Sequence, residues 1–110
     1  MAGLRRDSDG DAKVACRTPT PGRKGVTNIP QWRFDLVRSA IIEVIATGEV
    51  KFAELPGLIG ERLKKKDRER LGSISWNVTT VKLEMEVRGE IERVEGRGPQ
   101  RLRLARGVQP

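Results

Sequence analysis

Apolar residues recur at helical spacing in three stretches of this chain. The first stretch runs over residues 28–48, where Asn28 or Ile29 can cap a helix, Pro30 suits its first turn and Gly48 ends it. Its apolar positions fall on one helical face. They are Phe34, Val37, Ile41, Val44 and Ile45.

Residues 49–52, "EVKF", predict a short strand after the first helix. The second helical stretch covers residues 53–70 and tolerates Pro56 in its first turn. Its second half, residues 64–70, holds five bases and two acids, a composition typical of a solvated helix end. The inward positions are Leu55, Leu58, Ile59 and Leu63.

A third helix is expected to begin at Ser73 or Ser75 and to end at Arg88, because Gly89 favours left-handed backbone there. Two strand-like segments follow, at 90–95 and 101–105, and "GRGPQ" between them supplies the residues of a turn. The two segments predict a hairpin.

The order helix, strand, helix, helix, strand, strand is that of the winged-helix variant of the helix-turn-helix fold. We therefore expect an α+β fold: a three-helix bundle with a short strand after helix 1 and a C-terminal two-stranded wing. The expected division is a flexible basic arm over residues 1–28, the folded domain over residues 29–106 and a tail over residues 107–110.

Two resemblances support this fold. "TTVKLEMEVRGEIERV" resembles the third helix and first wing strand of bacterial winged-helix regulators. Four motifs between residues 18 and 104 resemble a family of small uncharacterised bacterial proteins, for which no function is assigned. The motifs are Ile29-Pro30-x-Trp32, Trp76-x-x-Thr79-Thr80-Val81-Lys82-Leu83, Gly89-x-Ile91-Glu92-Arg93 and Pro99-Gln100-Arg101-Leu102.

The third helix carries two apolar faces rather than one. The core face is formed by residues 74, 78, 81 and 85, whereas Trp76, Leu83 and Val87 fall on nearly the opposite side. Either the wing and the N-terminal segment cover this second face, or it forms a contact with a protein partner or a second subunit.

The net charge of +7 is unevenly distributed along the chain. Residues 29–95 contain twelve bases and twelve acids, so the excess lies in the two ends. A basic surface points to nucleic acid. Phosphate contacts are therefore expected from the arm and the wing. The candidates are Arg23, Lys24, Arg97, Arg101 and Arg103.

Groove contacts are expected from the third helix, because Asn and Lys bond base edges and Thr bonds phosphate or touches a thymine methyl. The candidates are Asn77, Thr79, Thr80 and Lys82. Glu84 and Glu86 lie beside them and oppose a polyanion. In the wing, Glu92 and Glu95 can instead pair with arginines of the other strand.

The sequence gives little indication of a catalytic site or a metal site. The chain has no histidine, one cysteine (Cys16) and no phosphate-binding glycine motif, so we expect no enzyme, no metal and no cofactor. No apolar run reaches the length of a membrane span, and the lone thiol fits a reducing cytoplasm.

Two functions follow from these patterns. The first is a transcription-regulator-like protein that contacts double-stranded DNA through the third helix and an Arg-rich wing. The alternative is a protein-interaction or dimerisation module without DNA binding, since the winged-helix scaffold does not fix its function. In that case Trp76, Leu83 and Val87 form the interface.

Overall fold

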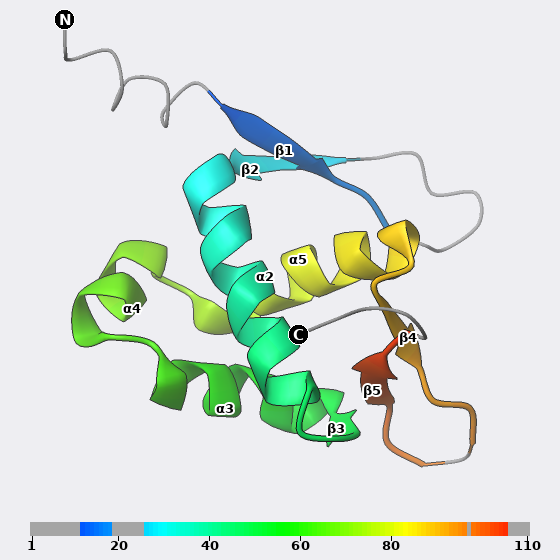
Figure 1. The fold of residues 1–110 in the computed structure, drawn as a ribbon. Helices are drawn as coiled ribbons and strands as arrows, with labels where there is room; N and C mark the ends of the chain where they lie inside the picture. Colours follow the sequence, from blue (N-terminus) through cyan, green and yellow to red (C-terminus); the bar gives the residue numbers. More distant parts are fainter. Residues whose placement is uncertain (1–11, 19–25, 97, 106–110) are drawn as a thin grey trace, which may run out of the picture.

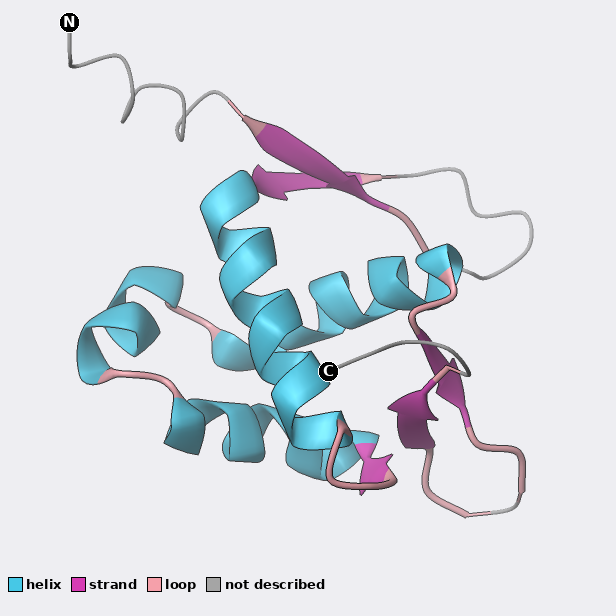
Figure 2. Cartoon of the chain, viewed as in Figure 1, coloured by secondary structure: helices cyan, strands magenta, loops and turns pink. Residues whose placement is uncertain are grey.

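A computed structural model of the chain describes residues 12–18, 26–96 and 98–105. Over these ranges the fold is α+β, with four α-helices, one short 3-10 helix and two small antiparallel sheets (Figures 1 and 2). The elements are β1 (Lys13–Cys16), β2 (Thr27–Pro30), α2 (Gln31–Ile45), β3 (Val50–Lys51), η1 (Phe52–Glu54), α3 (Leu55–Arg62), α4 (Lys65–Leu71), α5 (Ile74–Arg88), β4 (Ile91–Arg93) and β5 (Arg101–Leu104).

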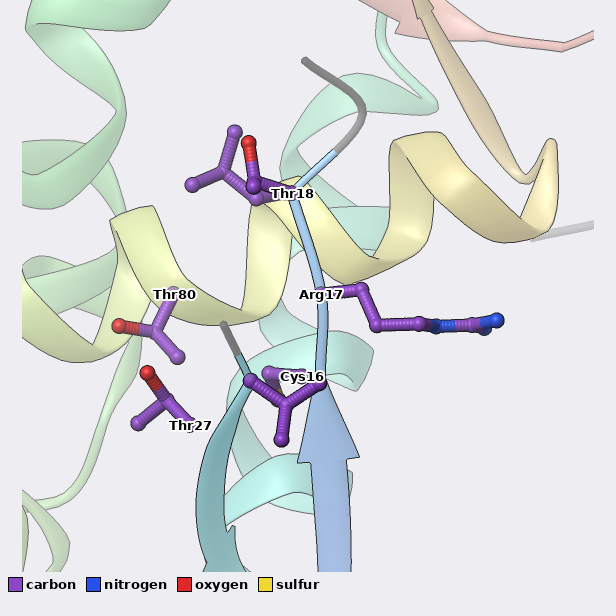
Figure 3. Close-up of a pocket in the computed structure, with 7 residues that line it drawn as sticks. Cys16, Arg17, Thr18, Thr27 and Thr80 are labelled. Carbon is purple, nitrogen blue, oxygen red and sulfur yellow. The ribbon is translucent and has the colours of Figure 1, made fainter. Parts of the chain in front are cut away.

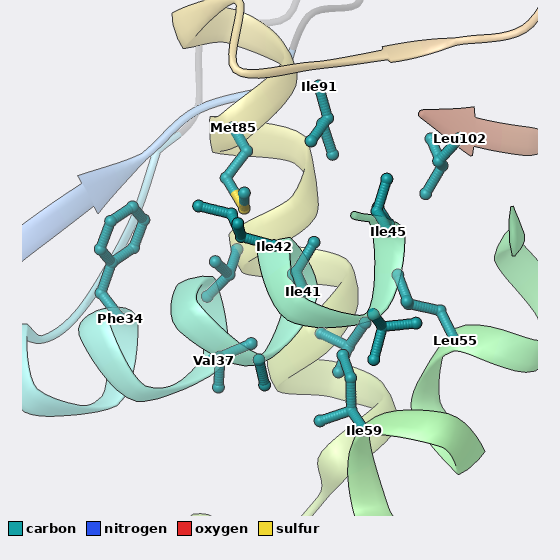
Figure 4. Packing of buried hydrophobic residues seen from close by; sticks show 14 of the residues in the cluster. Phe34, Val37, Ile41, Ile42, Ile45, Leu55, Ile59, Met85, Ile91 and Leu102 are labelled. Atoms are coloured by element: carbon teal, nitrogen blue, oxygen red, sulfur yellow. The ribbon is translucent and has the colours of Figure 1, made fainter. Parts of the chain in front are cut away.

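Helix α2 forms the centre of the molecule. It confirms the first predicted helix, although it begins after Pro30, and Asn28 lies in β2 rather than at a cap. Gly48 ends the turn behind it with a positive φ of 139°, a conformation that side chains disfavour. The apolar face of α2 packs against α3 and α5 (Figure 4). Its buried apolar residues are Phe34, Val37, Ala40, Ile41, Ile42, Val44 and Ile45.

The single helix predicted over residues 53–70 is wrong, because the chain breaks into α3 and α4. Leu63 adopts extended backbone between them and buries its side chain. The Arg68 guanidinium stabilises the break, since Nη1 donates to the carbonyls of Gly60 (3.0 Å) and Leu63 (2.8 Å). An arginine five residues downstream therefore satisfies carbonyls that a continuous helix would have bonded internally.

Helix α5 has the predicted bounds. Ser73 caps its start by accepting a hydrogen bond from the backbone N–H of Trp76 at 3.2 Å, and Gly89 ends it with a φ of 77°. The predicted core face is buried against α2 and α3. Val78, Val81 and Met85 are fully buried there, while Ile74 is partly buried.

Strands β4 and β5 form the C-terminal hairpin and confirm the pairing predicted from the sequence. Glu92 faces Arg103 and Ile91 faces Leu104 in its register. Strand β3 adds to the other edge of β5, giving the order β3-β5-β4. Ile91 and Leu102 are buried and join this sheet to the helices (Figure 4).

Strands β1 and β2 form a second sheet, the N-terminal sheet, which joins residues of the predicted flexible arm (1–28) to the first residues of the predicted domain. Val14 pairs with Ile29, and both side chains are buried in the core together with Cys16. These three side chains anchor the sheet on α2 and α5. The ordered structure therefore begins before residue 29.

Candidate functional site

Asn77 is not available to a DNA groove, which corrects its expected role. Its side chain is 1% exposed, and Nδ2 donates to the carbonyls of Leu71 (3.1 Å) and Ser73 (2.7 Å). The amide thus ties the start of α5 to the end of α4.

Lys82 is also withdrawn from the surface, so its groove contact is corrected too. The side chain is 2% exposed, with Nζ 2.6 Å from Glu86 Oε2 and 4.6 Å from the centre of the Phe52 ring. Burial lowers the pKa of Lys82, although the hydrogen bond that its ammonium donates to Glu86 opposes the change. A lysine held in this way stabilises the contact between α5 and η1.

One strip along the outward side of α5 is uncharged. Trp76 is 47% exposed, whereas Leu83, Val87, Thr79 and Thr80 are partly buried. The second apolar face expected from the sequence therefore exists, and its large anchor, Trp76, projects into solvent. We call Trp76, Thr79, Thr80, Leu83 and Val87 the outer strip of α5.

A cavity of about 290 Å³ lies between the outer strip and the N-terminal sheet (Figure 3). Thr27 and Thr80 lie next to each other in its wall, whereas the Arg17 side chain extends away from them. Burial, and then the charge of Glu84, raises the pKa of the Cys16 thiol to about 11, so the thiol is a poor nucleophile. The lining consists of Cys16, Arg17, Thr18, Val26, Thr27, Thr80 and Leu83.

A buried carboxylate binds Arg17, one of the residues that line this cavity. Glu84 is 1% exposed and accepts hydrogen bonds at Oε2 from Arg17 Nη2 (2.7 Å) and Arg88 Nε (2.8 Å). Burial alone would raise the pKa of Glu84, but the bonds from the two arginines outweigh it and lower that pKa to about 2. Glu84 thus stays ionised and acts as a structural anion.

The arginines of the C-terminal hairpin have acidic partners. Arg103 Nε lies 2.6 Å from Glu92 Oε2, and Arg101 Nη1 lies 4.0 Å from Glu49 Oε1. Their positive charge is largely balanced within the protein. The remaining predicted phosphate contacts, Arg23, Lys24 and Arg97, lie outside the described residues.

A different group of bases, to which no sequence pattern assigned a binding role, lacks acidic partners among the described residues. Lys64, Lys65, Lys66 and Arg70 are exposed on and before α4, and none forms an ion pair with any described residue. The Arg70 guanidinium stacks over the Trp32 ring at 4.0 Å.

Arg33 also lies near this indole, with Cζ 5.4 Å from the ring centre, and its buried Nε has no hydrogen-bond partner in the described chain. We call these five bases and Trp32 the basic patch. The composition of the run over residues 64–70 indicates only a solvated helix end. The proximity of this run to the start of α2 follows from the fold and has no local sequence signal.

A protein-family model matches most of the chain. A family of unknown function, DUF6958, has a model that matches residues 13–102, from the first residue of β1 into β5. No curated protein and no solved structure matches the chain. Among the described helices none could cross a membrane, and the described side chains include no cluster suited to a metal ion.

Proposed function

The chain belongs to this family of unknown function, and we propose that it is a winged-helix protein that binds the phosphate backbone of double-stranded DNA through the basic patch. The proposal keeps the transcription-regulator-like role expected from the sequence but moves the contacts from α5 to α4 and the start of α2.

The arrangement of elements supports the winged-helix assignment. Helix α2 is followed by a short strand, two short helices, α5 and a hairpin, and the short strand pairs with the second strand of that hairpin. This order matches the one expected for that fold, with α5 in the place of the third helix. The additional break between α3 and α4 places α4, which carries Lys65, Lys66 and Arg70, to one side of α2 (Figure 1).

The observation that supports the DNA proposal is that no acidic side chain of the described residues forms an ion pair with the basic patch. Elsewhere Arg17, Arg38 and Arg103 are bonded to glutamates. By contrast, three consecutive lysines stand at the start of α4, where the helix dipole disfavours cations and the lysines repel one another. An external polyanion removes this repulsion, and DNA supplies phosphates in a closely spaced row.

The patch suits phosphates better than bases. The face of Trp32 is occupied by the Arg70 guanidinium, so the indole is not open for stacking on a base. Asn77 and Lys82 are bonded internally, and the outer strip of α5 carries no charge. We therefore expect contacts that position the protein without reading sequence.

Fluorescence anisotropy with a labelled random-sequence duplex tests the proposal. Four exposed bases predict that log K falls by roughly 3 to 4 per log unit of salt, a loss of about a hundredfold between 50 and 200 mM. Lys64→Ala/Lys65→Ala/Lys66→Ala should abolish most of the binding. The matched control Arg101→Ala/Arg103→Ala, which removes exposed but paired bases, should retain it.

Two results would contradict the proposal. One is the absence of binding by the native chain at 50 mM salt. The other is binding that survives loss of the three lysines but disappears with Arg101 and Arg103, which would return the contact to the C-terminal hairpin.

A further inference from the structure

We propose that the outer strip of α5 binds a second copy of this chain, and that Trp76 of each copy fills the cavity beside Leu83 in the other. This interface lies outside the basic patch and does not depend on the DNA proposal.

The outer strip is self-complementary in composition. One-third of the chain is charged (34%), yet the face of α5 that carries Trp76, Thr79, Thr80 and Leu83 holds no charged residue between them. Because successive residues are rotated by 100° about the helix axis, these four side chains point in similar directions, toward the solvent side of the helix. A charged partner surface would find no opposite charge at this strip. A second uncharged strip would instead remove the apolar surface of both strips from water.

An exposed anchor and a cavity occur on the same helix. Trp76 is 47% exposed, and the cavity opens beside Leu83, seven residues further along and so about 10.5 Å away along the axis. Trp76 is therefore displaced from the cavity of its own chain. A two-fold axis between Thr79 and Thr80 would bring each Trp76 onto the partner's Leu83, with the two helices antiparallel.

This geometry is that of an isologous interface, in which the same patch serves both copies. The threonines at the crossing point are small and let the helices approach closely. Trp76 supplies the large rigid anchor that dominates many interfaces when it enters a pocket. Each dimer thus contains two identical contacts.

The cavity has the chemistry that an indole requires. Leu83 and Val26 supply apolar walls, and Val26 is itself 52% exposed in the single chain. The hydroxyls of Thr27 and Thr80 can accept a hydrogen bond from the indole N–H. Filling the cavity would therefore cover the two most exposed large apolar side chains of the described chain together.

Salt should affect this interface in the direction opposite to its effect on DNA binding. Each copy carries a net charge of +7, so two copies repel one another, and added salt screens that repulsion. The dimer is expected to tighten as salt rises, whereas DNA binding weakens. Failure of one proposal therefore leaves the other separately testable.

Sedimentation velocity of the full chain, from micromolar to hundreds of micromolar, measures the dimer. Trp76→Ala removes the anchor, and Thr27→Phe fills the cavity from an exposed strand position. Each is expected to raise the dissociation constant by at least about thirtyfold. Trp32→Phe changes the other indole and should leave the dimer intact, and circular dichroism checks that each variant is folded.

Mixing the two impaired variants provides the decisive result. The Thr27→Phe chain still offers Trp76, and the Trp76→Ala chain still offers the cavity, so a heterodimer regains one of the two contacts. The mixture should sediment faster than either variant alone. A native chain that stays monomeric, a dimer that tolerates both substitutions, or a mixture that stays monomeric would each overturn the proposal.

Discussion

Glu84 binds Arg17 through three hydrogen bonds, one of them from the Arg17 backbone N–H at 2.9 Å. The pair fixes the end of β1 on α5 and places Cys16 and Arg17 in the wall of the cavity. The N-terminal sheet is thus held by a buried anion as well as by Val14 and Ile29.

Replacing Glu84 with Gln should destabilise the protein. The substitution removes the charge that Arg17 and Arg88 share and weakens hydrogen bonds to a charged group, at a cost of about 2 kcal/mol in the free energy of unfolding. Urea unfolding measures this loss. Glu92→Gln on the exposed hairpin pair is the matched control and should cost less than about 1 kcal/mol. An equal loss of stability in the two variants would show that Glu84 contributes no more than an exposed ion pair does.

The same carboxylate predicts an acid dependence of stability. The pKa of Glu84 falls from its ordinary value of 4.5 to about 2 in the folded chain, so between these values the unfolded chain binds a proton that the folded chain does not. The stabilisation is complete above the ordinary pKa and is lost as the pH falls toward 2. The stability difference between native chain and Glu84→Gln should shrink over that interval, which urea unfolding at a series of pH values would detect.

Cys16 should resist modification in the folded chain. Its pKa is raised from 9.0 to about 11, which reduces the thiolate at neutral pH about a hundredfold, and its side chain is buried. A chromogenic disulfide reagent should react at least about a hundred times more slowly with the native chain than with the chain in denaturant. Similar rates would mean that β1 detaches readily. The chain has one cysteine, so the signal has a single source.

Replacement of Lys82 should affect stability but not DNA binding, whereas replacement of Lys65 should affect DNA binding but not stability. Lys82→Ala removes a buried cation and its packed stem, and we expect a loss of about 2 to 3 kcal/mol in the free energy of unfolding with unchanged DNA affinity. Lys65→Ala should leave stability within about 0.5 kcal/mol and weaken DNA binding. Thermal unfolding and anisotropy on the same samples separate the two effects. A larger loss of DNA affinity for Lys82→Ala than for Lys65→Ala would instead indicate that α5 contacts the DNA groove.

Local signals predicted much of the fold. Ser73 and Gly89 mark the ends of α5 because a side-chain cap and left-handed backbone are properties of single residues. The pair formed by Glu92 and Arg103 is one of the pairings expected from opposite charges on two strands that are consecutive in the sequence.

The errors concern contacts between distant segments. Strand β1 has four residues, and its partner Ile29 lies fifteen positions beyond Val14, so no short-range period revealed it. A helical projection placed Asn77 and Lys82 on the flanks of α5 but did not show the carbonyl of Leu71 or the ring of Phe52 that cover them. The basic patch was missed for the same reason, because Trp32 is far from α4 in the sequence.

Amide chemical shifts in a ¹⁵N-labelled chain, recorded before and after addition of a random-sequence duplex, test the central claim most directly. If the basic patch binds phosphate, the largest changes should fall at residues 31–33 and 64–70, with small changes along the outer strip of α5. Changes concentrated on residues 76–87 and the C-terminal hairpin, with residues 64–70 unaffected, would contradict the account and return DNA recognition to α5.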